Sequence, residues 1–232
     1  MGGLIAATCV CAVASFLICG IPFGMIIAAQ MSGIDVRKVG SGNIGMTNVA
    51  RSAGGKAAAL TFACDVGKGS LCIVLFRWLI SAICLGGDIA SLALNGGFAW
   101  VVTTLYMACV FGHIFSPYLH FHGGKGISVG LGAALGMCWP MGLGMLAVFL
   151  VLTVPTHFVS LGSIAAAASL PFFGLGFGAR GIAILPLALV SVVVIWSHRE
   201  NIGRLLRGEE RRFSVGKDKK LADKGSSKGG RA

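Results

Sequence analysis

The sequence predicts an all-α integral membrane protein, a polytopic bundle of about seven transmembrane helices, some of them short. Three observations favour this fold class. Hydrophobic residues make up 56% of the 232 residues, charged residues make up only 12%, and the mean hydropathy is +0.86. This apolar content is more than the core of a water-soluble protein needs, so most of the chain is expected to lie in lipid.

Apolar segments alternate with glycines, prolines and charges along the chain. A bilayer core of about 30 Å requires about 20 apolar residues per helix, and fewer where protein covers the segment. The segments comprise residues 4–28, 69–86, 98–115, 126–139, 141–154, 158–177 and 181–197. The fourth and fifth are short, so five spans are the alternative to seven. Pro140 and Pro155 are expected to separate the fourth, fifth and sixth segments, because proline lacks the donor that a helix interior needs.

The two ends of the chain are predicted to differ in character. The first apolar run resembles a signal peptide, but Met1 to Leu4 carries no basic residue and the run is long, so we expect it to be retained. Residues 1–210 then form one membrane-embedded domain. Residues 211–232 form a basic cytoplasmic tail, and its Lys, Gly and Ser-rich end from about Lys217 is expected to be disordered.

Basic residues predict the orientation of the chain. The first long loop contains Arg37, Lys38, Arg51 and Lys56, and the chain after residue 198 holds 11 of the 19 lysines and arginines. Both parts are expected to face the cytoplasm, which places the N-terminus outside. Only an odd number of spans keeps both parts on one side.

A polar, glycine-rich segment follows the first apolar run. Its candidate ligand-binding residues are Ser41, Gly42, Asn43, Thr47, Asn48 and Arg51. Glycines let the backbone approach a ligand, successive amides can converge on an anion, and Arg51 can bind phosphate or carboxylate through two parallel hydrogen bonds. We interpret the segment as an anion site beside the membrane. The alternative is a solvated basic loop.

A second polar segment begins where the third helix is expected to end. His113 is followed by Gly123, Gly124, Lys125 and Gly126 at a predicted helix start, where the helix dipole and the lysine both favour an anion. Leu119 and Gly126 stand where a nucleotide-binding P-loop needs a glycine and a Ser or Thr, which excludes that motif. The alternative is a helix-breaking turn with a lysine that reaches the membrane surface.

The third polar segment runs from His198 to Glu210. In a helix, His198 and Asn201 share one face, and the segment would lie along the membrane surface over the bundle mouth. The alternative is an amphipathic segment drawn to anionic lipid. Asp65 and Lys68 lie three residues apart at the edge of the second helix and are expected to pair, because charges close to lipid normally do.

The cysteines are expected to pack without forming a metal site. All eight lie in apolar segments without a ligand-like cluster, at positions 9, 11, 19, 64, 72, 84, 109 and 138. No metal and no cofactor is therefore predicted.

Together, the three segments resemble a known family. The patterns are Gly-Ser-Gly-Asn-x-Gly-x-Thr-Asn-Val-x-Arg at 40–51, Gly-His-x-Phe at 112–115 with Gly-Gly-Lys-Gly at 123–126, and His-x-x-Asn-Ile-x-Arg-Leu-x-x-Gly-x-Glu at 198–210. They are similar to the bacterial acyl-phosphate:glycerol-3-phosphate acyltransferases of the PlsY type. Asp65-x-x-Lys68-Gly69 also fits. Met46, His122 and the Ser116-Pro117 pair depart from the usual pattern.

The resemblance implies transfer of a fatty acyl group from acyl phosphate to the 1-hydroxyl of glycerol 3-phosphate, giving lysophosphatidic acid and phosphate at the cytoplasmic side of the bacterial inner membrane. It implies no nucleic-acid partner. Arg51, Lys125 and the backbone of residues 41–43 would bind glycerol phosphate, residues 123–126 would hold the acyl phosphate, and His198 and Asn201 would orient the phosphate or the hydroxyl. Thr47, Asn48 and Lys68 are also expected to contact substrate.

Two mechanisms and two other functions remain open at this point. Direct attack is favoured because phosphate leaves readily, so that positioning and charge neutralisation can supply the rate. The alternative is an acyl-enzyme on Ser41 with His113 or His198 as base, and a substrate phosphate is another candidate base. Acyl-CoA and acyl-carrier-protein donors are not excluded by the residues alone. A transporter for phosphate-bearing solutes and a scaffold for anionic lipid are the rival functions.

Overall fold

The computed structural model describes residues 1–213, and every regular element in that range is a helix. The longer helices are α1 (Gly2–Gly20), α2 (Phe23–Ser32), α3 (Met46–Ser52), α4 (Gly55–Cys84), α5 (Ala99–Ile114), α6 (Ile127–Met137), α7 (Trp139–Thr156), α8 (Val159–Gly176), α9 (Ile184–Ser197) and α10 (Arg199–Leu206). Short 3₁₀ turns are η1 (Val36–Lys38), η2 (Ala90–Leu92), η3 (Pro117–Leu119) and η4 (Gly181–Ala183). The predicted disorder from about Lys217 lies outside the described residues.

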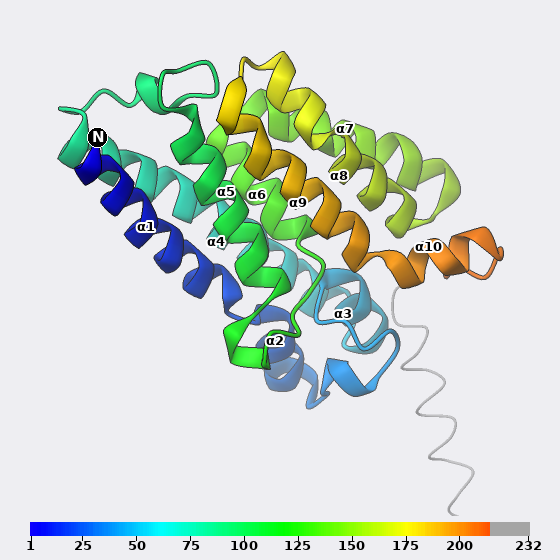
Figure 1. The fold of residues 1–232 in the computed structure, drawn as a ribbon. Helices are drawn as coiled ribbons and strands as arrows, with labels where there is room; N and C mark the ends of the chain where they lie inside the picture. The colour runs from blue at the N-terminus through cyan, green and yellow to red at the C-terminus, as the bar shows by residue number, and fades with distance from the viewer. Residues whose placement is uncertain (214–232) are drawn as a thin grey trace, which may run out of the picture.

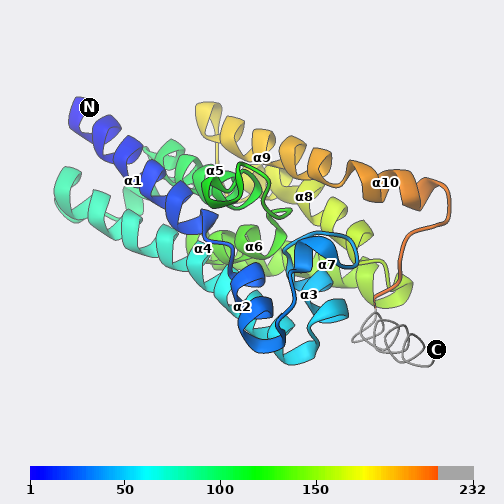
Figure 2. The same ribbon diagram turned by 90° about the horizontal axis from the view of Figure 1, so that it is seen from below.

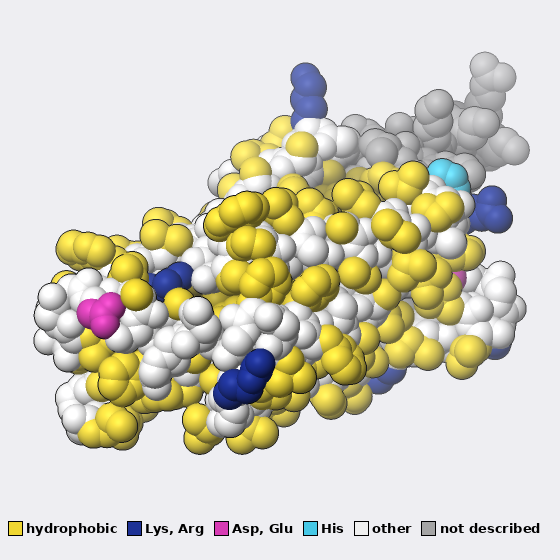
Figure 3. All heavy atoms as spheres, turned by 90° about the horizontal axis from the view of Figure 1, so that it is seen from above, with side chains coloured by type: hydrophobic (Ala, Val, Ile, Leu, Met, Phe, Trp, Pro, Cys, Tyr) yellow, Lys and Arg dark blue, Asp and Glu magenta, His cyan; other side chains and the backbone are white. Residues whose placement is uncertain are grey.

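The helices form a bundle with short elements gathered at one end. The pairs α1 and α5, α4 and α6, α7 and α8, and α8 and α9 pack side by side. Figure 1 shows α2, α3 and α10 at the end of the bundle opposite the N-terminus, and Figure 2 shows the same grouping from below. Apolar side chains cover most of the face in Figure 3, with few charges among them, as expected of a surface that meets lipid.

The number of candidate spans is smaller than the number of apolar helices. Within residues 1–213, five stretches are long and apolar enough to cross a bilayer, and α9 with α10, bent by 57°, makes a sixth if the bent pair is counted as one. All seven apolar segments of the sequence are helical, but α6 has only 11 residues and is too short to span by itself. The all-helical membrane fold is confirmed, with five or six candidate spans instead of seven.

Helix α6 ends inside the bundle because protein groups satisfy its last carbonyls. Cys138 is extended, and one guanidinium nitrogen of Arg77, on α4, donates to the carbonyls of Gly136 and Met137 at 3.3 and 3.0 Å. A helix C-terminus carries partial negative charge, so a cation stabilises it. This contact gives the arginine a partner in an otherwise apolar region.

Helices α4 and α6 approach closely because glycines face each other's backbone. A Cβ added at Gly132 would overlap the carbonyl oxygen of Val66, and one added at Gly69 would lie 2.5 Å from the carbonyl oxygen of Val129. Small residues at such positions allow dispersion contacts between backbones that larger side chains prevent. This contact fixes α6, and with it the loop that precedes it.

Three boundaries differ from the sequence prediction. Helix α4 begins at Gly55 instead of residue 69, because Asp65 and Lys68 satisfy each other within the helix. The first apolar segment is broken before Pro22, which starts a second helix. Pro155 lies inside the last turn of α7, and the helix ends at Thr156, just before His157, whose φ is 60°. Pro140, by contrast, is the second residue of α7, and the break from α6 lies just before it at Cys138, so the two helices are separate as predicted.

The close contact at Gly132 predicts that a larger side chain there destabilises the α4–α6 interface. Gly132→Ala should lower the free energy of unfolding by about 1–3 kcal/mol, because the helices must separate to admit the methyl group. Thermal unfolding of the purified protein in detergent measures this change. Gly67→Ala on α4 is the matched control, because a Cβ there meets nothing within 4 Å. Equal stability of the two variants would contradict the close contact.

Candidate active site

The three polar segments line one cavity of about 1040 Å³. The sequence-predicted residues on its wall are Ser41, Gly42, Asn43, Thr47, Asn48, Arg51, His113, Gly123, Gly124, Lys125, Gly126, His198 and Asn201. Three segments that are distant in the sequence therefore meet at one cavity. Lys68 does not line the cavity, because its ammonium group points into a buried network behind the wall.

Asn48 holds the loop that carries Ser41 and Asn43. Its amide nitrogen donates to the carbonyls of Val36, Val39 and Asn43 at 2.9, 3.0 and 2.9 Å, and its amide oxygen accepts from the Ser41 backbone at 2.9 Å. All of its hydrogen-bonding groups are thus used within the loop, and the side chain is buried. This geometry favours a role for Asn48 in shaping the loop over direct contact with substrate.

Arg51 lies in the last turn of α3 and is buried against the chain that follows α10. Its guanidinium donates to the carbonyls of Arg211 and Arg212, each at 3.5 Å. The Phe213 amide in turn donates to the His157 carbonyl at 2.9 Å, between α7 and α8. Residues 209–213 therefore connect α10, α3 and the α7–α8 turn beside the cavity.

The glycine loop before α6 fits against His113. The amides of Gly123 and Gly124 donate to the carbonyls of Ile114 and His113 at 2.9 and 3.0 Å. A Cβ added at Gly124 would overlap Nε2 of His113, and one at Gly123 would overlap the His113 carbonyl oxygen. Only glycine fits these two positions, and the next residue, Lys125, is placed by them.

Lys68 on α4 joins three parts of the chain through its ammonium group. Nζ lies 2.7 Å from Oδ1 of Asp65, donates to the Ile21 carbonyl at 2.8 Å, and lies 3.3 Å from Nδ1 of His113. The predicted pairing with Asp65 is confirmed. Because an ammonium group has no lone pair, Nδ1 of His113 must accept, and Nε2 then carries the proton beside Gly124. This geometry leaves His113 no free acceptor and favours a positioning role over that of a base.

A second network holds Lys125 from the side of α10. Its Nζ donates to Oδ1 of Asn201, and Nδ2 of Asn201 donates to Oε1 of Glu210 at 2.6 Å. Ser160 donates to the same carboxylate oxygen at 2.9 Å, and Nε of Arg204 donates to the other at 2.7 Å. Sequence analysis did not select Ser160, Arg204 or Glu210 as site residues, although Glu210 closes the third motif.

His198 lies at the bend between α9 and α10 and is buried on the cavity wall. Its Nδ1 is 2.8 Å from the Val194 carbonyl oxygen, and because a carbonyl can only accept, Nδ1 carries the proton. In the neutral ring, Nε2 is then an acceptor. Unlike His113, His198 can therefore receive a proton or accept a hydrogen bond from a hydroxyl.

The charge state of Lys125 is sensitive to its surroundings. Burial, and then the nearby Arg204 charge, lower the pKa of Lys125 from 10.5 to about 8, against the opposing attraction of Glu210. Burial alone would raise the pKa of Glu210, but hydrogen bonds from Asn201, Arg204 and Ser160 keep it below its ordinary value. The network thus holds a carboxylate and an ammonium group whose charge is lost near pH 8.

The remaining wall of the cavity is apolar and is formed by side chains of α5, α7, α8 and α9. It includes Val110, Met145, Leu146, Phe149, Ala166, Leu170, Val190 and Val194. Cationic and amide groups therefore lie at one part of the cavity and hydrocarbon at another. Such a cavity suits a ligand, or a pair of ligands, with a phosphate and a long apolar chain.

The family match of this chain and its relatives of similar sequence carry the same description. Residues 9–208 match the family described as glycerol-3-phosphate acyltransferase. A protein of Dinoroseobacter shibae with that description is 39% identical over 88% of this chain and 92% of its own. Another, from Synechococcus sp. (strain CC9902), is 36% identical over 85% of this chain and 91% of its own.

Solved structures with a similar fold point the same way. The crystal structure of PlsY (YgiH), an integral membrane glycerol 3-phosphate acyltransferase, in its glycerol 3-phosphate form matches with a TM-score of 0.76 and 32% identity, over 89% of this chain and 96% of that one. The lysophosphatidic acid form of that protein matches with a TM-score of 0.73 and 31% identity, over 89% and 95%.

The Lys68 network predicts a strong coupling between two substitutions. Lys68→Met should lower the free energy of unfolding by about 3–5 kcal/mol, because it leaves the Asp65 carboxylate buried without its cation. The double variant Asp65→Asn with Lys68→Met should regain a large part of this loss. Thermal unfolding in detergent measures both, and an equal loss in the single and double variants would show that the ion pair is not the cause.

Proposed function

This chain belongs to the glycerol-3-phosphate acyltransferase family, of the PlsY type, and we propose that its acyl donor is an acyl phosphate. The products are then 1-acyl-glycerol 3-phosphate, which is lysophosphatidic acid, and inorganic phosphate. The observation that carries this proposal is the single cavity in which Arg51 and Lys125 lie with an apolar wall from four helices. Two phosphates and one acyl chain have complementary places in it.

Glycerol 3-phosphate binds at the cationic part of the cavity in this proposal. The solved relative has forms with glycerol 3-phosphate and with lysophosphatidic acid, the acceptor and the product of the same reaction. Arg51 and Lys125 supply positive charge, and of the backbone amides of residues 41–43 that of Asn43 can donate to the substrate, because those of Ser41 and Gly42 already donate to Asn48 and Val39. The exposed Ser41 side chain and Thr47 lie on the same wall and can add hydroxyl contacts.

The acyl phosphate lies with its chain along the apolar wall and its phosphate at the glycine loop. The amides of Gly123 and Gly124 already donate to the Ile114 and His113 carbonyls, and the loop places Lys125 and the start of α6 close to the developing negative charge, where the helix dipole also favours an anion. Direct attack then proceeds in one transfer. The glycerol hydroxyl oxygen bonds to the acyl carbon, the bond from that carbon to the phosphate oxygen breaks, and the leaving phosphate takes the electron pair.

The hydroxyl proton has two possible acceptors near the reacting atoms. Nε2 of His198 is free to accept, because Nδ1 is bound to the Val194 carbonyl. A phosphate oxygen of either substrate is the other acceptor, and the proton ends on the released phosphate in both cases. An acyl-enzyme on Ser41 with His113 as base is less favoured, because Nδ1 of His113 is committed to Lys68, and His198 is then the base left for that route.

The protein is a multi-span integral membrane protein, and we place its active site at the cytoplasmic face of the bacterial inner membrane. The basic residues of the first loop and of α10 support this orientation, because Figure 1 shows these segments at the same end of the bundle and both contribute residues to the cavity wall. The opposite end carries Asp88 in the turn after α4 and faces outward, with the N-terminus.

A donor comparison tests the reaction. Purified protein in detergent or lipidic mesophase should release phosphate and form lysophosphatidic acid when given acyl phosphate and glycerol 3-phosphate. Acyl-CoA and acyl-carrier-protein of equal chain length should give product at background rate. Turnover with either thioester and none with acyl phosphate would refute the donor assignment, and a folded sample inactive with all three would refute the reaction.

Two substitutions test the cations. Arg51→Ala and Lys125→Ala should each lower kcat/KM by about thirtyfold or more, because truncating one partner of a buried charge pair costs about 2–5 kcal/mol. Steady-state phosphate release measures this. Lys56→Ala is the matched control, because Lys56 is exposed at the start of α4 and does not line the cavity. Wild-type kinetics in both cavity variants would mean that other cations bind the phosphates.

The lowered pKa of Lys125 predicts a pH dependence. Since the ammonium group loses its proton as the pH rises through about 8, kcat/KM for the phosphate substrates should fall between pH 7 and pH 9. Lys125→Arg keeps its charge over this range, so its profile should be flat there, whatever its absolute rate. The same downward slope in both proteins would assign the pH dependence to another group.

A further inference from the structure

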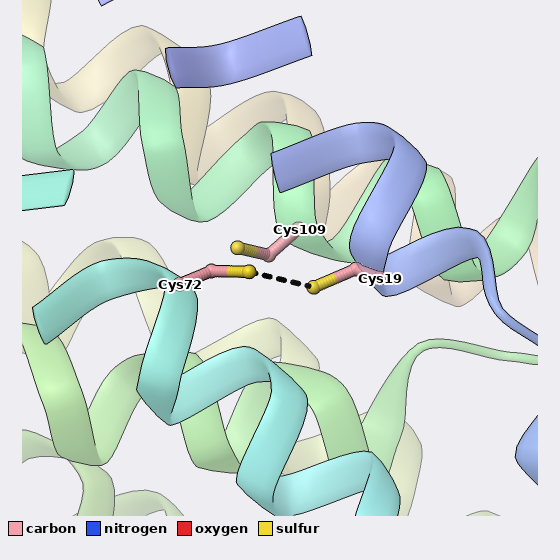
Figure 4. A group of neighbouring side chains, drawn as sticks. All are labelled: Cys19, Cys72 and Cys109. Atoms are coloured by element: carbon pink, nitrogen blue, oxygen red, sulfur yellow. Dashed lines mark hydrogen bonds between the residues drawn. The ribbon is translucent and has the colours of Figure 1, made fainter. Parts of the chain in front are cut away.

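Three cysteines from three helices meet inside the bundle. They are Cys19 in the last turn of α1, Cys72 on α4 and Cys109 on α5, and each is at most 1% exposed. Figure 4 shows their sulfur atoms pointing toward one another. The three sulfurs lie within 4.8 Å of one another, with 3.9 Å between those of Cys19 and Cys72. The sequence expectation that the cysteines form no cluster is therefore wrong.

The spacing suits three bonds to one common centre. At metal–sulfur bond lengths of about 2.3 Å, three sulfurs bound to one atom lie about 4.0 Å apart in a planar arrangement and closer together in a pyramidal one. The Cys19–Cys72 separation of 3.9 Å is close to this geometry, and small side-chain rotations bring in the third sulfur, which lies within 4.8 Å of the other two. Within residues 1–213 the group consists of these three thiols alone, with no histidine or carboxylate among its members. Structural zinc sites have four ligands, so this group fits a three-coordinate centre better.

Charge decides which three-coordinate centre the site favours. The three cysteines belong to the main apolar core of the bundle, and Lys68, one helical turn before Cys72, already has Asp65 as its counter-ion. Three thiolates carry three negative charges, so a monovalent ion leaves two and a divalent ion leaves one. An uncompensated buried charge costs several kcal/mol, whereas a trivalent centre leaves none.

We propose that Cys19, Cys72 and Cys109 form a binding site for a trivalent metalloid, with neutral arsenous acid as the representative ligand. Three S–H bonds and three As–O bonds break, three As–S bonds form, and three water molecules leave. Arsenic stays trivalent, so the step needs no oxidant or reductant. Both the reactant and the bound product are uncharged, which permits entry into an apolar interior. The bound atom links α1, α4 and α5 just below the Lys68 network.

The test uses the full-length protein in detergent micelles with arsenite as the probe, and native mass spectrometry as the readout. We expect one adduct per chain with the mass of one arsenic atom less three hydrogens, and arsenic absorption spectroscopy with three sulfur neighbours and no oxygen. The unfolding temperature should rise in the same sample, because the centre cross-links three helices.

Variants separate the cluster from the other thiols. Cys72→Ala and, independently, Cys109→Ala should lose the three-sulfur adduct and the rise in unfolding temperature. Cys64→Ala, on the same helix as Cys72 but outside the cluster, should keep both. The proposal is overturned if wild-type protein forms no adduct while folded, if the adduct forms only after denaturation, or if it persists in both cluster variants.

Discussion

The buried ammonium group of Lys68 is the contact on which the architecture of the site depends. An uncompensated charge in an apolar bundle costs several kcal/mol, and Lys68 avoids that cost with a carboxylate, a carbonyl and an imidazole from three different places. The carbonyl belongs to Ile21, where the first helix breaks before Pro22. One side chain thus stabilises the break between α1 and α2 and fixes the ring of His113. That ring in turn supports the glycine loop.

Lys125 is consequently held from two sides by networks that share no other residue. On one side, His113 and Gly124 position its backbone, and on the other, Asn201 and Glu210 hold its side chain. A flexible lysine loses much of its rotamer freedom in such a setting before any substrate arrives. Preorganisation of this kind suits phosphate chemistry, in which positioning and charge neutralisation can supply much of the rate.

The sequence allowed the membrane fold and the three polar segments of the cavity wall to be predicted, because each segment carries its own local chemistry of glycines, amides and cations between apolar runs. It could not place Lys68, whose direction depends on partners contributed by α1 and α5. It also could not reveal the meeting of Cys19, Cys72 and Cys109, which are separated by tens of residues on different helices. The start of α4 was misplaced for a related reason, since the internal pairing of Asp65 and Lys68 removes the need for an apolar run there.

The termination of α6 at Met137 has a consequence for how this protein is assembled. The eleven residues of α6 extend about 16 Å, roughly half of the bilayer core. The insertion machinery recognises an apolar segment of that length too weakly to release it into lipid by itself. The last carbonyl of α6 accepts a hydrogen bond from Arg77 of α4, and the glycines of α6 pack against the backbone of that helix. The helices must therefore enter the membrane in a fixed order: α4 is inserted first, and α6 then packs against it.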